Sequence, residues 1–293
     1  MILVYGELLA DMVGTNEGDS LKFNAFPGGG PFNLAVNAKQ AGAKVGFTCR
    51  VGNDPVGRFL LSQVKKANFD YLDVQIDDVR NTTLAFVTLT NGERDFAFHR
   101  HDTADYFIEV KDIDTKKFND INLIHLCSLL LSEENGPQVA NEIIKLAHKN
   151  GTKISFDVNL RMDLFDTVND AKRAYKPYFN EVDIIKFSDD EIKIFAEIDD
   201  LDKAIDKMYK KDTLMVVSLG AKGSMCKYNE ITVFEPTQKL TPVDTTGAGD
   251  SFFGTFLANI ENKDWSEENI RFALKKGNEA GAKTTQFYGG VKL

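Results

Sequence analysis

A glycine-rich segment that leads into an apolar one holds the residues with the clearest chemical potential. Residues 244–254 read DTTGAGDSFFG, and the run FFGTFLANI at its end predicts a buried helix. The small residues Gly247, Ala248 and Gly249 leave their backbone N–H groups free to surround the start of that helix, which is a favourable place for an anion. Asp250 falls in the first turn, beside that anion. A carboxylate there suits phosphoryl transfer, in which it takes a proton from a hydroxyl while the amides stabilise the developing charge.

This segment also has a purely structural interpretation. Asp250 could be a helix-capping acid, and TGAG an ordinary start of a helix. The segment is not the glycine fingerprint of a dinucleotide-binding fold, because Phe252 occupies the third glycine position and no strand immediately precedes it. No G-x-x-x-x-G-K-[ST] sequence occurs in the chain, which excludes that type of phosphate-binding loop. The phosphoryl-transfer and capping interpretations of Asp250 both remain open at this point.

A second glycine-rich helix start lies near the N-terminus, where residues 27–35 read PGGGPFNLA. Asn33 would fall on the first helical turn, with its amide facing a ligand or bonded to local backbone. With this motif added, the chain resembles the ribokinase-like (PfkB) carbohydrate kinases, and bacterial fructokinases most among them. The family's N-terminal signature has paired glycines, an asparagine, a small residue and further glycines, and its C-terminal signature is similar to D-T-x-G-A-G-D followed by a small residue. The matching positions are Gly29, Asn33, Ala35, Gly42 and Gly52 for the first signature and Asp244 to Gly254 for the second.

The resemblance implies roles for residues at both signatures and after the first expected strand. Asp11 follows that strand and would accept hydrogen bonds from neighbouring sugar hydroxyls, whereas its residue type alone suggests only a surface acid. A monovalent cation such as K⁺ could bind near Asp244 and Thr246. The implied substrate-binding residues are Asp11, Gly28, Gly29, Asn33, Arg100 and Arg161, and the implied catalytic group is Asp250 with the amides of Gly247, Ala248 and Gly249.

Two further segments gain a role from the same resemblance, and each also has a structural interpretation. Arg100, in FHRHDTAD, could hydrogen-bond the sugar or pair with an acid of its own segment. Asp157 and Asn159, in FDVNLR, could order water around Mg²⁺, and Arg161 could face a phosphate. Without a ligand, FDVNLR would be an Asx-rich turn with an exposed arginine.

The C-terminal half contains the nucleotide contacts that the resemblance implies. In SDDE, Ser188 replaces the family's usual asparagine, whereas Glu191 matches a residue that organises metal and phosphate; S-x-x-E would also cap a helix without any ligand. The segment SLGAKG resembles the turn that lines the ATP groove, although a generic strand-to-turn segment would read the same way. Asn278 matches a position near adenine, or it is a polar surface residue. The implied cofactors are ATP and Mg²⁺, with Ser188, Ser218, Gly220, Lys222, Gly223 and Asn278 as nucleotide-binding residues and Glu191, Asp157 and Asn159 as the metal site.

The composition of the 293-residue chain limits the partners that it could have. A net charge of −9 argues against nucleic acid and anionic membranes, but not against ATP, whose phosphates a local ring of amides and a metal ion can bind. Three widely spaced cysteines without a C-x-x-C pattern favour reduced, buried thiols in a cytoplasmic protein. The sequence shows no signal peptide, and no apolar run is long enough to span a bilayer.

The elements that must position these residues follow from an alternation of short apolar runs with amphipathic stretches. The runs predict buried strands, and stretches such as GPQVANEIIKLAHKN predict helices between them. This alternation predicts an α/β fold with a doubly wound, mostly parallel sheet, as a single domain over residues 1–293. Ligands in such sheets bind at the carboxyl ends of the strands. The expected strands are ILVYG, KVGFTCRVG, INLIHLCS, KISFDVN, DIIKFS and TLMVVSLG.

Two segments break this alternation. Residues 10–27 are polar and irregular, with hints of short strands, and residues 83–100 predict a hairpin that turns at Asn91-Gly92. Together, segments near 10–27 and 83–105 predict a small antiparallel sheet, which the resemblance identifies as a lid over the sugar. The exposed edges of such a sheet could pair two copies of the chain into a homodimer.

Phosphoryl transfer at Asp250 and the resemblance together imply an ATP-dependent sugar kinase, and the resemblance favours the conversion of fructose to fructose 6-phosphate. Within the family, 2-keto-3-deoxygluconate kinase is the first alternative, because the carboxylate of that substrate needs a cation and Arg100 or Arg161 could supply it. Ribokinase and nucleoside kinase activities are further alternatives. A non-catalytic, sugar-sensing regulator belongs to a different class, and such a protein would have no need of Asp250.

Overall fold

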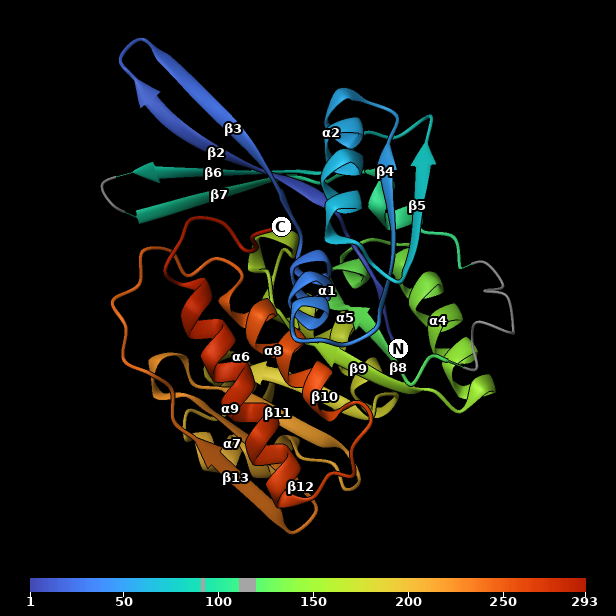
Figure 1. Cartoon of the computed structure of the whole chain (residues 1–293), viewed down its shortest axis with the longest axis vertical. Helices are drawn as coiled ribbons and strands as arrows, with labels where there is room; N and C mark the ends of the chain where they lie inside the picture. Colours follow the sequence, from blue (N-terminus) through green and yellow to red (C-terminus); the bar gives the residue numbers. More distant parts are fainter. Residues whose placement is uncertain (91–92, 111–119) are drawn as a thin grey trace.

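The computed structural model describes residues 1–90, 93–110 and 120–293. A large sheet lies between two layers of helices, and a smaller sheet projects from one end of the molecule (Figure 1). The first helical layer consists of α1 (Gly30–Gln40), α2 (Pro55–Val64), α8 (Ala248–Ile260) and α9 (Glu267–Thr284), and the second of α4 (Gly136–Asn150), α5 (Val168–Tyr175), α6 (Asp189–Ala196) and α7 (Leu201–Met208).

The large sheet has nine strands and is mostly parallel, as the alternation of strands and helices predicts. In chain order the strands are β1 (Ile2–Tyr5), β4 (Val45–Gly52), β5 (Tyr71–Asp77), β8 (Leu123–Cys127), β9 (Lys153–Asp157), β10 (Ile184–Ser188), β11 (Leu214–Ser218), β12 (Ser224–Tyr228) and β13 (Ile231–Glu235). Their spatial order is β13-β12-β11-β10-β9-β8-β1-β4-β5, and among the described strands of this sheet the antiparallel pairings are β11 with β12 and β12 with β13. The six expected strands are confirmed. The other three, β5, β12 and β13, lie at or next to the sheet edges, where polar side chains interrupt the apolar pattern.

Alternate residues of a central strand enter opposite hydrophobic cores. In β1, Ile2 and Val4 belong to the core shared with α1 and α8, whereas Leu3 and Tyr5 belong to the core shared with α4 and α6. Burial on both faces explains why these strands are short, unbroken apolar runs. Because the central strands are parallel, the residues that follow them gather at one edge of the sheet, and the site is built there.

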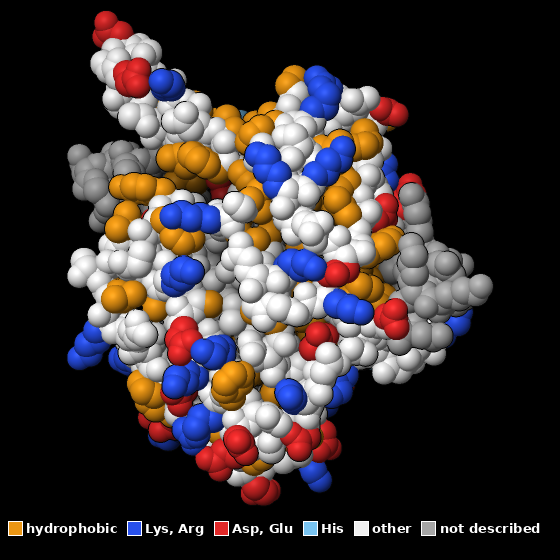
Figure 2. Space-filling model, in the orientation of Figure 1, with side chains coloured by type: hydrophobic (Ala, Val, Ile, Leu, Met, Phe, Trp, Pro, Cys, Tyr) orange, Lys and Arg blue, Asp and Glu red, His pale blue; other side chains and the backbone are white. Residues whose placement is uncertain are grey.

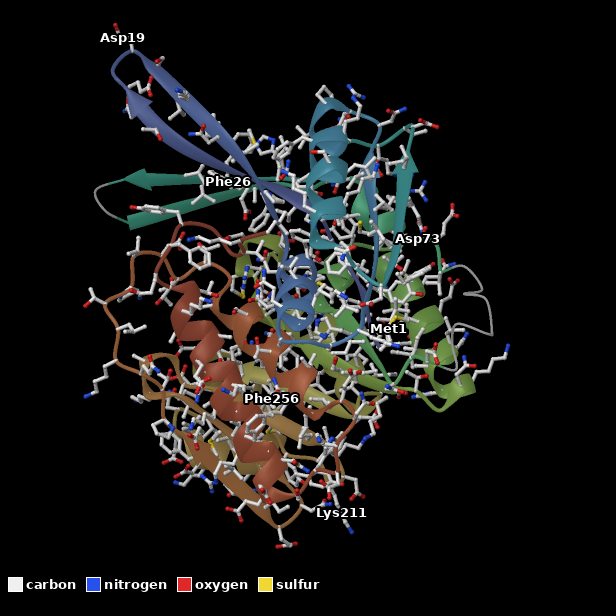
Figure 3. All side chains as sticks on the ribbon, viewed as in Figure 1. Met1, Asp19, Phe26, Asp73, Lys211 and Phe256 are labelled. Carbon is white, nitrogen blue, oxygen red and sulfur yellow. The ribbon has the colours of Figure 1, made fainter. Side chains whose placement is uncertain are left out.

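The small sheet has the order β3 (Ser20–Gly28), β2 (Leu9–Glu17), β6 (Leu84–Thr90) and β7 (Glu93–His99). The small sheet predicted from segments near 10–27 and 83–105 is confirmed, and residues 10–27, where the sequence gives only hints of short strands, lie in a regular hairpin of two nine-residue strands, β2 and β3. Most residues of β3 are exposed, so the hairpin depends on backbone pairing and shows little apolar alternation. Figure 3 shows Asp19 at its far tip and Phe26 closer to the body.

The second hairpin of the small sheet is confirmed as β6 and β7, whose pairing begins at Leu84 and His99. The predicted turn at Asn91-Gly92 lies outside the described residues. A parallel pairing between β2 and β6 joins the two hairpins into one sheet. In Figure 2, a few charged side chains lie at the projecting tip, and hydrophobic side chains gather in the angle between the small sheet and the body.

None of the helices in the described part of the chain combines the length and the apolar character that crossing a membrane requires.

Candidate active site

The start of α8 is built as the sequence predicts. The helix begins at Ala248, directly after Gly247, whose φ of 70° lies in the left-handed region that glycine adopts without strain. A side chain at Gly247 would also clash, because its Cβ would lie 2.4 Å from the Cα of Gly290. Asp250 occupies the first turn and is half-buried. The helix start therefore presents its free amides and one carboxylate side by side.

The two glycine-rich signatures meet in space. Asn33 Nδ2 donates a hydrogen bond of 3.0 Å to Oδ2 of Asp250, although 217 residues separate them in the chain. This contact depends on close packing of α1 against α8. At Gly254 a Cβ atom would lie 2.3 Å from the carbonyl oxygen of Leu34, so a side chain there would push the two helices apart. The predicted base and the predicted asparagine thus belong to one site.

The surroundings of Asp250 suit a carboxylate that accepts a proton. Burial raises its pKa above the ordinary value, while the hydrogen bond from Asn33 and the positive charges of Arg161 and Lys186 act in the opposite direction. A raised pKa strengthens the carboxylate as a proton acceptor, and a base is most effective when its pKa lies near the working pH. Asn33 also fixes the orientation of the carboxylate.

A polar cavity of about 410 Å³ opens in front of Asp250, between the large and the small sheet. The small sheet contributes Asp11 from β2, Ala85 from β6 and Phe98 from β7. Most of the residues predicted to bind sugar are brought together here. The predicted site residues that line the cavity are Asp11, Gly29, Asn33, Asn159, Arg161, Thr246, Gly247, Gly249 and Asp250.

Asp11 faces this cavity with little room behind it. A Cβ atom at Gly28 would lie 2.2 Å from Oδ2 of Asp11, so the predicted Gly28 makes space for the carboxylate without lining the cavity itself. Burial raises the pKa of Asp11 to about 7, and the negative charges of Asp250 and Asp244 add to this effect. Near neutral pH, ionisation of Asp11 is therefore unfavourable until a partner such as a hydroxyl or a cation arrives.

Replacing Asp11 with asparagine is expected to stabilise the sugar-free protein, and to do so more at pH 8 than at pH 5. Because its pKa is raised on folding, the stability associated with neutral Asp11 is lost as the pH rises from 3.8 towards about 7. Asparagine does not ionise and avoids this loss. We expect the gain in unfolding free energy to be larger by roughly 1–3 kcal/mol at pH 8. Urea denaturation of both proteins at both pH values measures it, and equal gains would contradict the raised pKa.

Arg100 is buried beside the polar cavity and does not belong to its lining. Its Nε donates a 2.9 Å hydrogen bond to Oδ2 of Asp105, and its Nη1 donates one of 3.2 Å to the carbonyl oxygen of Leu129. The guanidinium also lies 4.1 Å from the centre of the Tyr106 ring. The sequence left two interpretations of Arg100 open, sugar binding and pairing with an acid of its own segment. The structure shows the ion pair, with Asp105.

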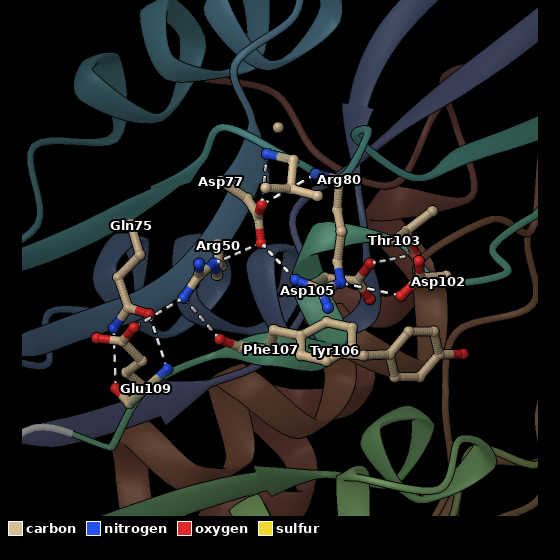
Figure 4. A network of polar contacts seen from close by, with 12 residues as sticks. Arg50, Gln75, Asp77, Arg80, Asp102, Thr103, Asp105, Tyr106, Phe107 and Glu109 are labelled. Atoms are coloured by element: carbon tan, nitrogen blue, oxygen red, sulfur yellow. Dashed lines mark hydrogen bonds and ion pairs between the residues drawn. The ribbon is translucent and has the colours of Figure 1, made fainter.

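Ion pairs continue around the segment that follows β7 (Figure 4). Arg80 donates to Oδ1 of Asp102 at 2.9 Å, and both Arg80 and Arg50 donate to Oδ2 of Asp77, at 3.4 and 3.0 Å. Arg50 lies on β4 and Asp77 on β5, and a second Arg50 nitrogen donates to the carbonyl oxygen of Phe107 at 2.9 Å. These contacts fasten the base of the small sheet to the large one.

A second cavity, of about 280 Å³ and mostly apolar, lies against α8 and α9. Thr245 and Gly249 line both cavities, so the two meet at the start of α8. Asn278 Nδ2 donates a 2.9 Å hydrogen bond to the carbonyl oxygen of Glu235, at the end of β13. Of the predicted nucleotide-binding residues, Ser218, Gly220, Gly223 and Asn278 line this cavity, whereas Ser188 and Lys222 do not belong to its lining.

The residues predicted to organise Mg²⁺ already bond to protein groups. Glu191 accepts hydrogen bonds from the amides of Ser188 at 2.7 Å and of Leu160 at 2.8 Å. Ser188 Oγ accepts in turn from the Glu191 amide, which completes a capping box at the start of α6. Within the described residues, no group of three His, Cys, Asp or Glu side chains could hold a metal ion directly. Asp157 and Glu191 therefore do not belong to a metal-binding group of this kind.

Asp244 ties down the loop that leads into α8. Its Oδ1 accepts from the Thr246 amide at 2.7 Å and its Oδ2 from the Gly289 amide at 3.0 Å. The carboxylate is buried, and it joins the loop before Gly247 to the C-terminal segment. The predicted cation residues Asp244 and Thr246 thus contribute to the shape of the site through their own contacts.

Three residues that shape the site have no counterpart in the sequence-based predictions. Lys186 Nζ donates to Oδ1 and Oδ2 of Asp157 at 2.8 and 2.9 Å, and both side chains are buried. A lysine inside the apolar run DIIKFS is the signal that could have revealed it, because a buried charge needs a partner. Thr245 lines both cavities and Phe98 lines the polar one. Their residue types carry no such signal.

Comparisons with known proteins agree with this geometry. Over 99% of this chain and 88% of the relative, the sequence is 34% identical to "Probable fructokinase-7" of Arabidopsis thaliana. The structure is similar to that of fructokinase from Xylella fastidiosa with bound ATP, with a TM-score of 0.86, 25% identity and coverage of 99% of this chain and 93% of that one. It is also similar to fructokinase from Vibrio cholerae O395 in a form with fructose, ADP and a calcium ion, with a TM-score of 0.85, 26% identity and coverage of 99% and 94%.

The family itself follows from the match over the whole length. The pattern of the pfkB family carbohydrate kinases matches residues 1–292. Together with the cavities that meet at α8 and the two glycine-rich signatures in contact, this match shows that the chain belongs to the pfkB family of carbohydrate kinases.

Proposed function

We propose that the protein transfers the γ-phosphoryl group of ATP to the primary hydroxyl of fructose and so forms fructose 6-phosphate. The observation that carries this proposal is the meeting of a polar and an apolar cavity at Thr245 and Gly249, with Asp250 facing the polar one. Support for the substrates comes from the similar proteins, which are named fructokinases and whose structures hold ATP or hold fructose with ADP.

In the proposed reaction, Asp250 accepts the hydroxyl proton as the hydroxyl oxygen attacks the γ-phosphorus, and ADP leaves. Asn33 keeps the carboxylate in place. The amides of Gly247, Ala248 and Gly249 stabilise the negative charge on the phosphoryl oxygens. Asp11 and Arg161 bind the sugar in the polar cavity, and the nucleotide extends from α8 towards Asn278 in the apolar one.

Metal ions enter this proposal as partners of the nucleotide. Mg²⁺ bound to the phosphates would neutralise part of their charge during transfer. Asp157, Asn159 and Glu191 would hold water molecules around it, because the carboxylates of Asp157 and Glu191 already accept hydrogen bonds from Lys186 and from backbone amides. For K⁺, the place proposed is the loop at Asp244 and Thr246, which the buried carboxylate keeps in shape.

A panel of sugars in an ATP-coupled assay tests the function directly. We expect fructose to give the highest kcat/KM, with production of fructose 6-phosphate. The alternative within the family is 2-keto-3-deoxygluconate, which one observation favours: Arg161 lines the polar cavity and could pair with a carboxylate. Higher kcat/KM for that acid, or for ribose, would replace fructose as the substrate. Binding of a sugar and ATP without any turnover would indicate a sugar-sensing regulator.

Replacing Asp11 with alanine is expected to weaken sugar binding and to spare ATP. The sugar hydroxyls that Asp11 would bond become unpaired in the closed site, at a cost of about 1–3 kcal/mol. The KM for fructose should rise accordingly, by roughly 5- to 150-fold, and the KM for ATP should change little. Steady-state kinetics with each substrate varied in turn measures both. Equal weakening of both substrates would contradict the assignment of Asp11 to the sugar.

We also propose that the small sheet is the lid of the sugar site, since it contributes Asp11, Ala85 and Phe98 to the polar cavity. Its edge strand β3 exposes Leu21 and Phe26, with exposed fractions of 54% and 43%, and a second copy of the chain could pair there to form a homodimer. Light scattering at micromolar protein tests the dimer, and a monomeric mass would exclude it. The three cysteines are free and buried, which supports a reducing, cytoplasmic location.

A further inference from the structure

A row of polar side chains lies on the face of the large sheet that α8 covers. It consists of His125 on β8, Ser155 and Asp157 on β9, and Lys186 on β10, which alternate with core residues of the opposite face. In the strand register His125 lies opposite Ser155, and Asp157 lies opposite Lys186. All four side chains are at most 5% exposed. Polar groups buried this deeply need partners within the protein or from a ligand.

The Lys186 ammonium has an incomplete set of partners. Of its three N–H donors, two bond to the carboxylate oxygens of Asp157. Across the described residues, no other acceptor lies within hydrogen-bonding distance of Nζ. His125 shares a hydrogen bond of 3.1 Å with Ser155, and burial, together with the charge of Lys186, lowers its pKa to about 3. His125 is therefore neutral, and Lys186 is the only cation of the row.

The ammonium lies directly behind the point where the two cavities meet. Nζ is 3.7 Å from the place where a Cβ atom of Gly249 would stand, and 5.9 Å from the centre of the Phe253 ring. Gly249 lines both cavities and belongs to the first turn of α8. Because Gly249 has no side chain, no Cβ atom fills the space beside the ammonium, next to the helix amides that would hold a phosphate.

We propose, on the basis of the kinase function above, that Lys186 is a phosphate-binding residue. Its third N–H donates a hydrogen bond to a phosphoryl oxygen of the nucleotide, and its charge offsets the charge of the group in transfer. Asp157 is the positioning residue that holds the ammonium beneath α8. Burial lowers the pKa of Lys186, but the negative charges of Asp157, Glu191 and Asp250 outweigh this effect and keep the side chain charged.

The test compares two nucleotide ligands that differ only in their phosphates. For Lys186→Met, calorimetry should show unchanged affinity for adenosine and about 10- to 100-fold weaker binding of ATP, with kcat lower by about 10²-fold. The double variant Asp157→Asn/Lys186→Met leaves no buried charge unpaired, so it should fold even if the single variant does not. It should still show a lower ratio of ATP to adenosine affinity. Lys186→Arg, which keeps the charge, should recover part of both losses.

Lys172 provides a matched control on the opposite helical layer. It is also buried, and it pairs at 2.8 Å with Glu197, whose side chain is exposed, so Lys172→Met removes a buried lysine charge away from both cavities. We expect no change in its ratio of ATP to adenosine affinity.

The possible outcomes separate this inference from the kinase function. Suppose that the wild-type protein phosphorylates a sugar, and that Lys186→Met and the double variant keep its ratio of ATP to adenosine affinity. The phosphate role of Lys186 is then wrong, and the kinase function stands. Equal weakening of adenosine and ATP would mean that the ion pair only supports the fold, which also overturns the inference. A wild-type protein that does not bind ATP would remove the kinase function, and the role of Lys186 with it.

Discussion

Replacing Asp250 with asparagine is expected to lower kcat by about 10²- to 10⁴-fold, because the change removes the proton acceptor and almost preserves the shape of the side chain. Asn33 can still donate its hydrogen bond to the new amide oxygen, and the amides at the start of α8 are unchanged. Fructose and ATP should therefore bind with affinities near those of the wild type. A coupled assay measures kcat, and calorimetry measures the two affinities.

The capping interpretation of Asp250 predicts a different result. Asparagine caps a helix nearly as well as aspartate, so a residue with only that role would tolerate the change. Asp202, in the first turn of α7, offers the matched control: Asp202→Asn should leave kcat unchanged. An Asp250→Asn protein that folds normally and keeps wild-type kcat would rule out the proposed base.

A second large effect is expected from a single methyl group at Gly254. The Cβ atom of Gly254→Ala would lie 2.3 Å from the carbonyl oxygen of Leu34, so α1 must move away from α8. That movement stretches the hydrogen bond between Asn33 and Asp250. We expect a loss of about 1–3 kcal/mol in unfolding free energy, and a drop in kcat of about 10²-fold from the displaced site.

The control for this prediction separates lost stability from lost alignment. Gly46→Ala, near the start of β4, brings a Cβ atom to 2.8 Å from the Leu3 side chain, so it should destabilise the protein without moving α1 or α8. Its kcat at a temperature where it is folded should match the wild type. If Gly254→Ala is folded and equally active, the orientation of Asp250 by Asn33 has no part in catalysis.

The central strands could be predicted because each is buried in the same way on both faces. In β10, the apolar residues Ile184, Ile185 and Phe187 are all buried, and between them only Lys186, of the row beneath α8, is polar, so the sequence itself indicates the strand. The hairpin of β2 and β3 has no such mark. Few of its residues are buried, and the hydrogen bonds that hold it join backbone atoms, which are the same for every side chain.

In the candidate site, too, residues in local sequence motifs could be predicted, and contacts that depend on the fold could not. Asp250 and Asn33 could be found because each belongs to a glycine-rich motif that fixes the local backbone. The contact between Lys186 and Asp157 depends instead on the register of β9 and β10, which no local pattern records. The partner of Arg100 could not be predicted either. The sequence allows this arginine to bind a sugar or to pair with a nearby acid, and only the folded structure shows that it pairs with Asp105.

The contact between Asn33 and Asp250 can form only late in synthesis of the chain. With 217 residues between them, at about 5–20 residues per second, the ribosome releases Asp250 roughly 10–40 s after Asn33. During that interval the sheet face that α8 later covers has no Phe253 or Phe256 against it, and its apolar strands stay open to water. The nascent chain is therefore most in need of chaperones after its strands are made and before its last two helices emerge.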